Sequence, residues 1–438
     1  MASADASALL IAAPASGSGK TTVTLALLRA FRQQGIRIGS FKVGPDYIDP
    51  AFHALATGNP CFNLDPWAMR NKSQAAILGQ AFKTSDLVIG EGVMGLFDGA
   101  QDGTGSTADV ANEWNLPIVF VVDAKGQGAS VGALLQGFSR FRSGVTLSGV
   151  IFNKVGGAGH IRLLKEAAAS TGIPALGFIP KSAELLLDQR HLGLVQARET
   201  QKIEAFLNGA AKIIAEHCDL SAIREIATET SLTGAQFSSP ILPLAQRIAI
   251  ADDDAFAFTY PHILSGWQAN GAEVTFFSPL ADEAPDPSAE AVFLPGGYPE
   301  LYGGKLAAAV NFKAGMRAAA AKNKAIYGEC GGFMTLGNSL TGHDGKSHEM
   351  LGLLPIETSF AEPKLHLGYR NARLIDDGIL GTSNQCFAAH EFHYASITKA
   401  GNARALFNVS DARSQELGPV GATIGSVSGS FIHLIDGR

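Results

Sequence analysis

Apolar residues in the first half of the chain come in short continuous runs, and amphipathic helical patterns separate these runs. Each run ends in polar or glycine-rich residues, as a strand does where the chain turns into a helix. Continuous apolar strands separated by helices indicate a parallel sheet that is buried on both faces. We therefore predict an α/β domain with strands at ALLIAAP (8–14), IGSFKV (38–43), DLVIGEG (86–92), IVFVVDA (118–124), GVIFNKV (149–155) and ALGFIP (175–180).

The same alternation of strands and helices restarts in the second half of the chain. A polar, Ser/Thr-rich stretch from Asp219 to Leu244 lies before it and ends in prolines, which is typical of a linker. We predict a first α/β domain at 1–218, a linker at 219–244 and a second α/β domain at 245–438. The strands expected in the second domain include RIAIADDD (247–254), EVTFFSP (273–279), AVFLPGG (291–297) and AIYGECGG (325–332).

Composition narrows the class of protein. The chain has 438 residues, 46% of them hydrophobic and 17% charged, so it can bury more than one core. A net charge of −6 without a basic stripe argues against a nucleic-acid surface. Four cysteines without CxxC spacing indicate free thiols in a reducing cytosol. No basic leader and no run of ~20 apolar residues is present, so we expect a cytoplasmic protein without a membrane partner.

The segment APASGSGKTT (13–22) resembles the P-loop pattern GxxxxGK[ST], although Pro14 stands where the first glycine would be. Glycines let successive amides converge on phosphate oxygens, the lysine neutralises the outer phosphates, and the next hydroxyl can bind Mg²⁺. A strand precedes the loop and a helix follows it, so the helix dipole points at the anion. An ordinary glycine-rich turn is the alternative. The predicted ATP-binding residues are Ser16, Gly17, Ser18, Gly19, Lys20, Thr21 and Thr22.

Charged side chains also follow two of the predicted strands. Lys42, Asp46 and Asp49 lie at the end of one strand, and Glu91 ends another, with Asp98 beyond it. The carboxyl ends of parallel strands line the crevice in which ligands sit. Acids beside phosphates make sense with a divalent cation between them, although any one of them can be a turn acid held by local hydrogen bonds. The predicted Mg²⁺ ligands are Thr21, Asp46 and Glu91.

Asn153 and Lys154 end a later strand of the first domain. An amide there can read a base edge, since it offers both a donor and an acceptor. It can equally cap the following turn. We count Asn153 among the ATP-binding candidates and leave both interpretations open.

The segment AIYGECGGFMTLG (325–337) brings a strand-like run to a sharp turn at Cys330 and then enters a helix. A thiol becomes nucleophilic where its thiolate is favoured, as at a helix N-terminus beside a histidine. Gly331 offers one amide for an oxyanion, and Gly296 and Gly297 in LPGGYPELY offer a second. A buried, inert cysteine is the alternative. The glycine-flanked elbow favours a nucleophile.

Several histidines stand downstream of the thiol, and their spacing alone does not choose its partner. His433 lies in SGSFIHLID, the last strand-like run of the chain. The run HEFH (390–393) has metal-like spacing, but no second cluster completes a site, so we favour a substrate or structural role over zinc. The downstream histidines are His343, His348, His366, His390, His393 and His433.

A phosphate loop and a Cys/His amidase in one chain suggest a single reaction. A carboxylate is a poor acyl donor, and phosphorylation by ATP converts it into an acyl phosphate that ammonia can attack. Glutamine hydrolysis at a thiol supplies that ammonia locally. We therefore expect an amide-forming ligase.

Taken in order, these motifs resemble the cobyrinic acid a,c-diamide synthases of corrinoid biosynthesis, including their hydrogenobyrinic acid counterparts. The resemblance covers nearly the whole chain, and KVGPDYIDP together with EGVMGLFDG is its most specific part. It implies a dethiobiotin-synthetase-like domain and then a class I glutamine amidotransferase domain. It also implies ATP, Mg²⁺, L-glutamine or ammonia, and a corrinoid acid amidated on its a- and c-acetates, and it leaves room for a homodimer. The motifs are APASGSGKTT, FKVGPDYIDP, EGVMGLFDG, FNKV, LPGGYPE, YGECGGFM, LGYR and HEFHY.

Residue roles follow from the resemblance by motif. It implies that Cys330 is the glutaminase nucleophile and His433 its base. Class I amidotransferases usually carry an acid two residues past this histidine, whereas this chain has Ile435, so the group that orients His433 stays open. The residues implied to organise metal and substrate are Asp46, Asp49, Glu91 and Asp98, with Lys42 and Tyr47 at the substrate.

Two rival functions stay open at this point. One is a related tetrapyrrole amidase that acts on a nickel macrocycle or on precursors of cobyric acid. The other is a partition-type nucleotide switch, whose ATPase activity would be insensitive to glutamine. The switch has no need of a thiol elbow.

Overall fold

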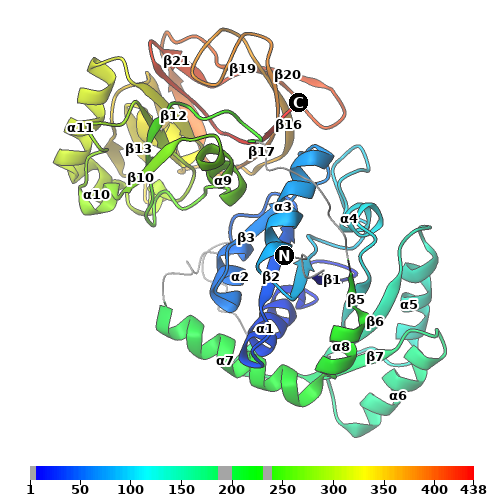
Figure 1. The fold of residues 1–438 in the computed structure, drawn as a ribbon. Helices are drawn as coiled ribbons and strands as arrows, with labels where there is room; N and C mark the ends of the chain where they lie inside the picture. The colour runs from blue at the N-terminus through cyan, green and yellow to red at the C-terminus, as the bar shows by residue number, and fades with distance from the viewer. Residues whose placement is uncertain (1–5, 186–199, 230–238) are drawn as a thin grey trace. The chain divides into compact units, whose positions relative to one another are not determined.

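The computed structural model describes residues 6–185, 200–229 and 239–438 (Figure 1). Its described residues fall into two compact units, one within Met1–Trp67 and Gln74–Gln236, the other within Ala68–Ser73 and Phe237–Arg438. Part of the predicted linker, 230–238, lies outside the described residues.

The first unit is built on a sheet with the strand order β3-β2-β4-β1-β5-β6-β7. Neighbours along this path pair in parallel, and β8 pairs antiparallel with β1. All six strands predicted from the apolar runs are present, which confirms the α/β class. The strands are β1 (Ser7–Ala12), β2 (Ile38–Val43), β3 (Cys61–Leu64), β4 (Leu87–Glu91), β5 (Ile118–Asp123), β6 (Leu147–Val155), β7 (Ala175–Pro180) and β8 (Thr228–Glu229).

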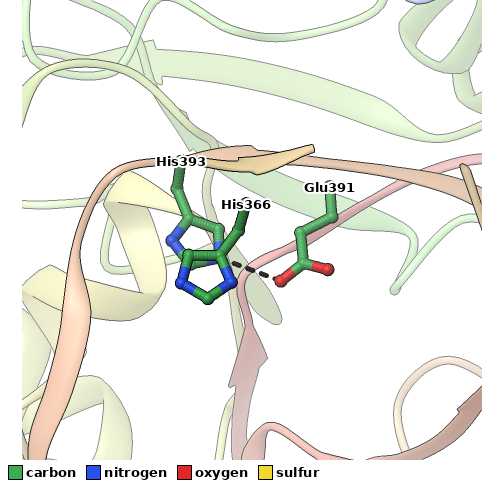
Figure 2. A group of neighbouring side chains, drawn as sticks. All are labelled: His366, Glu391 and His393. Carbon is green, nitrogen blue, oxygen red and sulfur yellow. Dashed lines mark hydrogen bonds and ion pairs between the residues drawn. The ribbon is translucent and has the colours of Figure 1, made fainter. Parts of the chain in front are cut away.

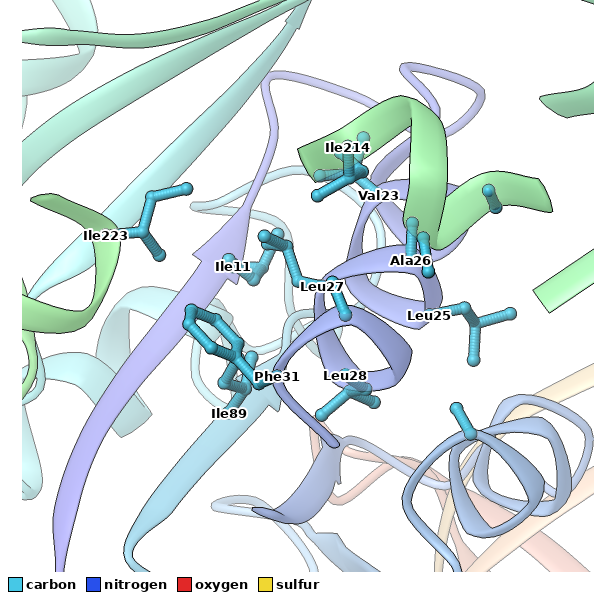
Figure 3. Packing of buried hydrophobic residues seen from close by; sticks show 14 of the residues in the cluster. Ile11, Val23, Leu25, Ala26, Leu27, Leu28, Phe31, Ile89, Ile214 and Ile223 are labelled. Atoms are coloured by element: carbon cyan, nitrogen blue, oxygen red, sulfur yellow. The ribbon is translucent and has the colours of Figure 1, made fainter. Parts of the chain in front are cut away.

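Helix α1 follows the phosphate loop directly and is anchored in the core of this unit. Val23, Leu27 and Phe31 repeat at a spacing of one helical turn and are at most 2% exposed. They pack with Ile11 of β1 and Ile89 of β4 (Figure 3). Each such burial contributes about 2 kcal/mol, so the start of α1 is held rigidly against the sheet. The helices are α1 (Lys20–Gln33), α2 (Asp49–Thr57), α3 (Asn71–Lys83), α4 (Thr107–Glu113), α5 (Ser130–Arg140), α6 (Ala158–Ala169), α7 (Thr200–His217) and α8 (Leu220–Ile226), with a 3₁₀ turn at Ala183–Leu185.

The second unit contains a central sheet in the order β10-β9-β11-β12-β22-β21. Its strands pair in parallel from β10 to β22, and β21 is antiparallel. This sheet contains the four strands predicted for the second half. They are β9 (Arg247–Ala251), β10 (Glu273–Phe277), β11 (Ala291–Leu294), β12 (Ala325–Glu329), β21 (Ala422–Ile424) and β22 (Val427–Ser430).

Two smaller sheets complete the second unit, in the orders β14-β13-β15-β18 and β20-β19-β16-β17-β23. Only Phe431 separates β22 from β23, so the chain passes from the central sheet to an antiparallel sheet at this residue. These strands are β13 (Ser339–Thr341), β14 (Ser347–Glu349), β15 (Ile356–Ser359), β16 (His366–Leu374), β17 (Cys386–His393), β18 (Ser396–Ala400), β19 (Phe407–Ser410), β20 (Glu416–Val420) and β23 (Ile432–Gly437).

The helices of the second unit are short, and α12 begins immediately after β12. Phe333 and Met334 of α12 are 1% exposed and join the core cluster of this unit. The elbow between β12 and α12 is therefore held by packing on its helical side. The helices are α9 (Pro261–Ala269), α10 (Gly303–Ala308), α11 (Val310–Ala321) and α12 (Gly331–Leu336), with 3₁₀ turns at Pro279–Ala281 and Pro299–Leu301.

Among the residues that the structure describes, no helix is both long and apolar enough to cross a membrane.

Candidate active sites

The phosphate loop of the first unit is shaped by glycines and braced by Asn153. Gly17 and Gly19 have φ of 80° and 90°, in the left-handed region that glycine adopts without strain. The side-chain amide of Asn153 donates to the Ser18 carbonyl (3.1 Å), and a Cβ at Gly19 would lie 2.1 Å from that amide nitrogen. In this structure the Asn153 side chain therefore stabilises the backbone of the loop beside the predicted nucleotide site.

Side chains from four elements meet beside this loop. Thr21 Oγ1, on α1, donates to Glu91 Oε1 (2.6 Å) at the end of β4 and lies 3.3 Å from Asp49 Oδ2 on α2. Lys42 Nζ, on β2, donates to Asp49 Oδ2 (2.5 Å) and to Glu91 Oε1 (2.8 Å). The structure thus brings these four predicted residues into one cluster.

The cluster is buried, and its charges stabilise one another. Glu91 is fully buried and Lys42 is 2% exposed. Burial alone would raise the pKa of Glu91, but Lys42 and His53 lower it below the usual value. Burial and the neighbouring Asp46 raise the pKa of Asp49 to about 6, against the pull of Lys42. Burial lowers the pKa of Lys20. Glu91 is therefore ionised at neutral pH.

The donor set of this cluster fits Mg²⁺. The Thr21 hydroxyl and the carboxylates of Asp49 and Glu91 are hard oxygen donors, which Mg²⁺ prefers. The Lys42 ammonium already lies between the two carboxylates, so the structure places a cation within reach of both. Of the three predicted ligands, Thr21 and Glu91 lie in this cluster. The third oxygen donor in it is Asp49, whereas the sequence pattern predicts Asp46.

Asp46 and Asp98 accept local backbone hydrogen bonds, as expected if they are turn acids, which was the alternative to a role at the metal. Asp46 Oδ1 accepts from the amides of Ile48 (2.7 Å) and Asp49 (3.1 Å), at the start of α2. Asp98 Oδ2 accepts from the amide of Gly95 (2.8 Å) in the turn after β4. Tyr47 is half-buried between the two acids of its segment. Their predicted roles toward metal and substrate stay predictions.

Sequence reasoning missed His53, which belongs to the same cluster. Its Nε2 lies 2.6 Å from Glu91 Oε2, and both side chains are fully buried. Burial opposes a charge on the ring, but Cys61 and Glu91 raise the pKa of His53 to about 10. One signal was available, because His53 stands four residues after Asp49 on α2 and so shares its face.

The second unit presents Cys330 on a strained elbow. Cys330 has φ 45° and ψ −101°, a conformation that side chains with a Cβ rarely adopt. Its amide donates to the Ser430 carbonyl (2.8 Å), and its thiol lies 3.8 Å from the Phe392 carbonyl. Burial, and then Glu300, raise the pKa of the thiol. A strained turn that carries a thiol between a strand and a helix is the geometry expected for the predicted nucleophile.

The other predicted residues of this site gather around the elbow. A Cβ at Gly331 would lie 3.0 Å from the amide nitrogen of Gly297, so the two glycine loops are in contact. A Cβ at Gly296 would lie 2.4 Å from His433 Cε1, so the imidazole packs on this loop. His433 is 1% exposed and Cys330 4%. The structure therefore brings all five predicted residues into one neighbourhood.

The glycine after the elbow is required by packing, which gives a stability prediction. A Cβ at Gly332 would lie 1.9 Å from the backbone oxygen of Leu294, which cannot move without displacing β11. We expect Gly332→Ala to destabilise the second unit by about 2–3 kcal/mol. Scanning calorimetry of the full chain measures this loss. Gly304→Ala is the matched control, since its nearest neighbour would be 3.6 Å away, and equal unfolding temperatures for the two variants would contradict the prediction.

His366, Glu391 and His393 form the cluster shown in Figure 2, with potential ligand atoms within 4.8 Å of one another. His393 Nε2 lies 2.9 Å from Glu391 Oε1, and Arg370 Nε donates to the other carboxylate oxygen (2.7 Å). The two imidazole rings are stacked, with centroids 4.6 Å apart and planes 4° apart. A zinc ion lies in the plane of each imidazole that binds it, about 2 Å from the ring nitrogen. Two stacked, parallel imidazoles have separate planes, so their nitrogen lone pairs do not meet at one such point. The arrangement fits an ion-pair network, which agrees with a structural role.

Two family models match the chain, one for each unit. Residues 9–195 match the CobQ/CobB/MinD/ParA nucleotide binding domain. Residues 247–437 match the CobB/CobQ-like glutamine amidotransferase domain. The phosphate loop and the thiol elbow lie within these two matches.

Curated relatives match the chain over almost its full length. The hydrogenobyrinate a,c-diamide synthase of Rhizobium meliloti (strain 1021) is 52% identical over 98% of this chain and 99% of the relative. The protein of that name from Brucella anthropi is 51% identical over 98% of each chain. A solved glutamine amidotransferase covers 38% of this chain and 80% of its own at 19% identity, with a TM-score of 0.27 that is too low to carry an argument. By the first two matches, the chain belongs to the hydrogenobyrinate a,c-diamide synthase family.

Proposed function

We propose that this chain uses ATP and glutamine to convert the a- and c-acetate carboxylates of hydrogenobyrinic acid into amides, in cobalamin biosynthesis. A glutamine-dependent, amide-forming ligase needs one site that activates a carboxylate and one that releases ammonia. The observation that carries the proposal is that the chain has both, the Thr21–Lys42–Asp49–Glu91 cluster at the phosphate loop and the Cys330–His433 elbow. The name of the relatives, hydrogenobyrinate a,c-diamide synthase, supports the choice of substrate.

Carboxylate activation is assigned to the first unit. An acetate oxygen of the corrinoid attacks the γ-phosphorus of ATP, the bond from this phosphorus to the bridging oxygen breaks, and ADP leaves. Ammonia then attacks the acyl carbon, the carbon–oxygen bond to phosphate breaks, and the nitrogen loses a proton. Lys20 neutralises the outer phosphates through this sequence. Thr21, Asp49 and Glu91 would hold Mg²⁺, which when bound supplies charge neutralisation at the phosphate oxygens.

Ammonia release is assigned to the second unit. The sulfur of Cys330 attacks the side-chain carbonyl carbon of glutamine, and His433 carries the thiol proton to the departing ammonia. The amides of Gly297 and Gly331 stabilise the oxyanion. Water then attacks the thioester with His433 as base, and glutamate leaves as the thiol is restored. The contact of these loops supports the assignment.

The substrate is tested by offering the purified enzyme each macrocycle with ATP and glutamine. Hydrogenobyrinic acid should gain two amides by mass spectrometry, with ADP and glutamate formed at each amidation. Amidation of a nickel tetrapyrrole alone would overturn the substrate assignment. ATP hydrolysis that ignores glutamine and macrocycle would instead support a nucleotide switch. Cobyrinic acid, offered in parallel, shows whether the corrin must be free of cobalt.

A further inference from the structure

The group that orients His433 is the missing part of the proposed ammonia site. An imidazole that takes a proton from a thiol through one nitrogen needs a partner at the other, which sets its tautomer and stabilises its charge. The position two residues along β23 does not supply one. Ile435 there is apolar and 1% exposed, and its carbonyl accepts from His262 Nε2 (3.0 Å).

Strand β23 does carry one acid, Asp436, but its carboxylate is already hydrogen-bonded to another residue. Asp436 is fully buried, and its Oδ2 accepts from the backbone amide of Arg70 (2.9 Å), in the segment Ala68–Ser73 of the same unit. Its Oδ1 accepts from Arg70 Nε (3.1 Å). A carboxylate held by an arginine in this way is not available to His433.

Glu329 reaches His433 from a different element. It is the last residue of β12, is 4% exposed, and stands directly before the nucleophile. Its Oε1 accepts from the amide of Leu434 (3.1 Å), the residue after His433. Its Oε2 lies 3.7 Å from His433 Nδ1. The carboxylate is thus anchored to the strand that carries the histidine, and it faces the ring nitrogen that an orienting acid should face.

Strand pairing explains why this acid can reach the imidazole. Glu329 lies opposite Ser430 in the β12–β22 ladder, and the chain enters β23 after Phe431. Two residues further along, His433 faces back toward the end of β12. The short crossing between the two sheets therefore places His433 beside an acid that is distant in sequence.

A second titratable side chain near His433 is His390, which lies directly opposite it in the β17–β23 ladder. Burial, and then His433 itself, lower the pKa of His390 to about 3, so its ring is neutral at physiological pH. A neutral imidazole does not supply the negative charge that stabilises an imidazolium. Of the groups that the described strands bring to His433, the carboxylate of Glu329 does.

We propose that Glu329 is the positioning residue for His433, and so takes the part that the acid two residues past the histidine plays in other class I amidotransferases. The proposal rests on the assignment of Cys330 and His433 to glutamine hydrolysis. The 3.7 Å separation shortens to a hydrogen bond when the imidazole becomes charged, since catalytic hydrogen bonds are often long before substrate binds. In this arrangement the orienting acid, Glu329, directly precedes the nucleophile, Cys330, in the sequence. The two ring nitrogens of His433 then serve one residue each.

Glu329→Gln tests this, because it keeps the shape of the side chain and an acceptor for Leu434 while removing the charge. We expect glutamate release by the full chain to fall about 10²-fold. This loss is smaller than the roughly 10⁴-fold seen when a Ser-His pair loses its aspartate, because a thiol is more acidic than a hydroxyl. Ammonia-driven amidation should stay within about twofold of wild type. The loss should fall on kcat, with the KM for glutamine within about twofold of wild type, whereas a merely structural role for Glu329 would disturb both constants.

Three comparisons make the outcome decisive. Glu349→Gln, an exposed acid of the same unit, should change none of these readouts. Wild-type glutaminase activity in Glu329→Gln, or a loss that falls on KM instead of kcat, would overturn the role of Glu329. Persistent glutamine hydrolysis by Cys330→Ser would instead overturn the proposed ammonia site, so the two failures are distinguishable.

A measurement on the unaltered protein covers the case in which Glu329→Gln does not fold. Nitrogen-15 NMR of histidine-labelled wild-type chain reports the tautomer of each imidazole, and the signals of His433 are those lost in His433→Gln. Orientation by Glu329 predicts that the neutral ring carries its proton on Nδ1. A ring protonated on Nε2 would overturn the inference.

Discussion

Replacing Cys330 by serine will abolish glutamine-driven amidation and leave ammonia-driven amidation in place. A serine hydroxyl is a much weaker nucleophile than a thiolate, and the nearly buried elbow disfavours its ionisation further. We expect glutamate release to fall by at least about 10³-fold, whereas amidation at saturating ammonium chloride stays within about twofold. The two nitrogen sources are compared by mass spectrometry of the corrinoid product.

Cys386→Ser is the control for this variant, since Cys386 lies on β17 outside the elbow. It should behave as wild type with either nitrogen source. Loss of the ammonia reaction in Cys330→Ser would contradict the division of labour between the two sites. Retained glutaminase activity would contradict the identity of the nucleophile.

Glu91→Gln will impair amidation with glutamine and with ammonia alike. Glu91 accepts from Thr21 and Lys42 and contacts His53, so its charge holds three polar groups of the phosphate-loop site. Without it, the buried Lys42 loses one of its two close carboxylate contacts among the described residues and keeps the ion pair with Asp49. We expect ADP and amide formation to fall about 10²- to 10³-fold, the range for loss of a charged group that acts at the transition state. The measurement is coupled ADP release with each nitrogen source.

Two further variants complete this test, one that keeps the charge at position 91 and one that removes an unrelated exposed charge. Glu91→Asp keeps the charge and should recover part of the activity, whereas Glu166→Gln, on the exposed face of α6, should have no effect. Removing one member of a buried ion pair also destabilises a protein by about 3–5 kcal/mol, so the fold of each variant is checked by calorimetry. A folded Glu91→Gln that works normally with ammonia would contradict the assignment of this cluster to carboxylate activation.

Much of the fold was predictable, because its parallel strands are continuous apolar runs. β3 was missed, since four residues after a proline give too short a pattern. The antiparallel strands of the second unit were also hard to define. Most side chains of β16 are half-buried and most of those of β20 are exposed, so neither strand carries a continuous apolar run.

The candidate sites were predictable where their signals are contiguous in sequence. The loop around Lys20 and the elbow around Cys330 each lie within about ten residues, so their local patterns carry the chemistry. His53 and Glu329 were missed because what matters about each is a contact with a distant residue, Glu91 in one case and His433 in the other. Such contacts depend on strand order and register, which spacing does not reveal.

The most direct test of the coupled reaction follows the nitrogen itself. Wild-type enzyme is given hydrogenobyrinic acid, ATP and glutamine labelled with nitrogen-15 in its amide, together with a low concentration of unlabelled ammonium chloride. We predict a product with two labelled amides, and an unlabelled product from Cys330→Ser when ammonium chloride is raised to saturation. An unlabelled wild-type product, or a labelled product from Cys330→Ser, would contradict the account.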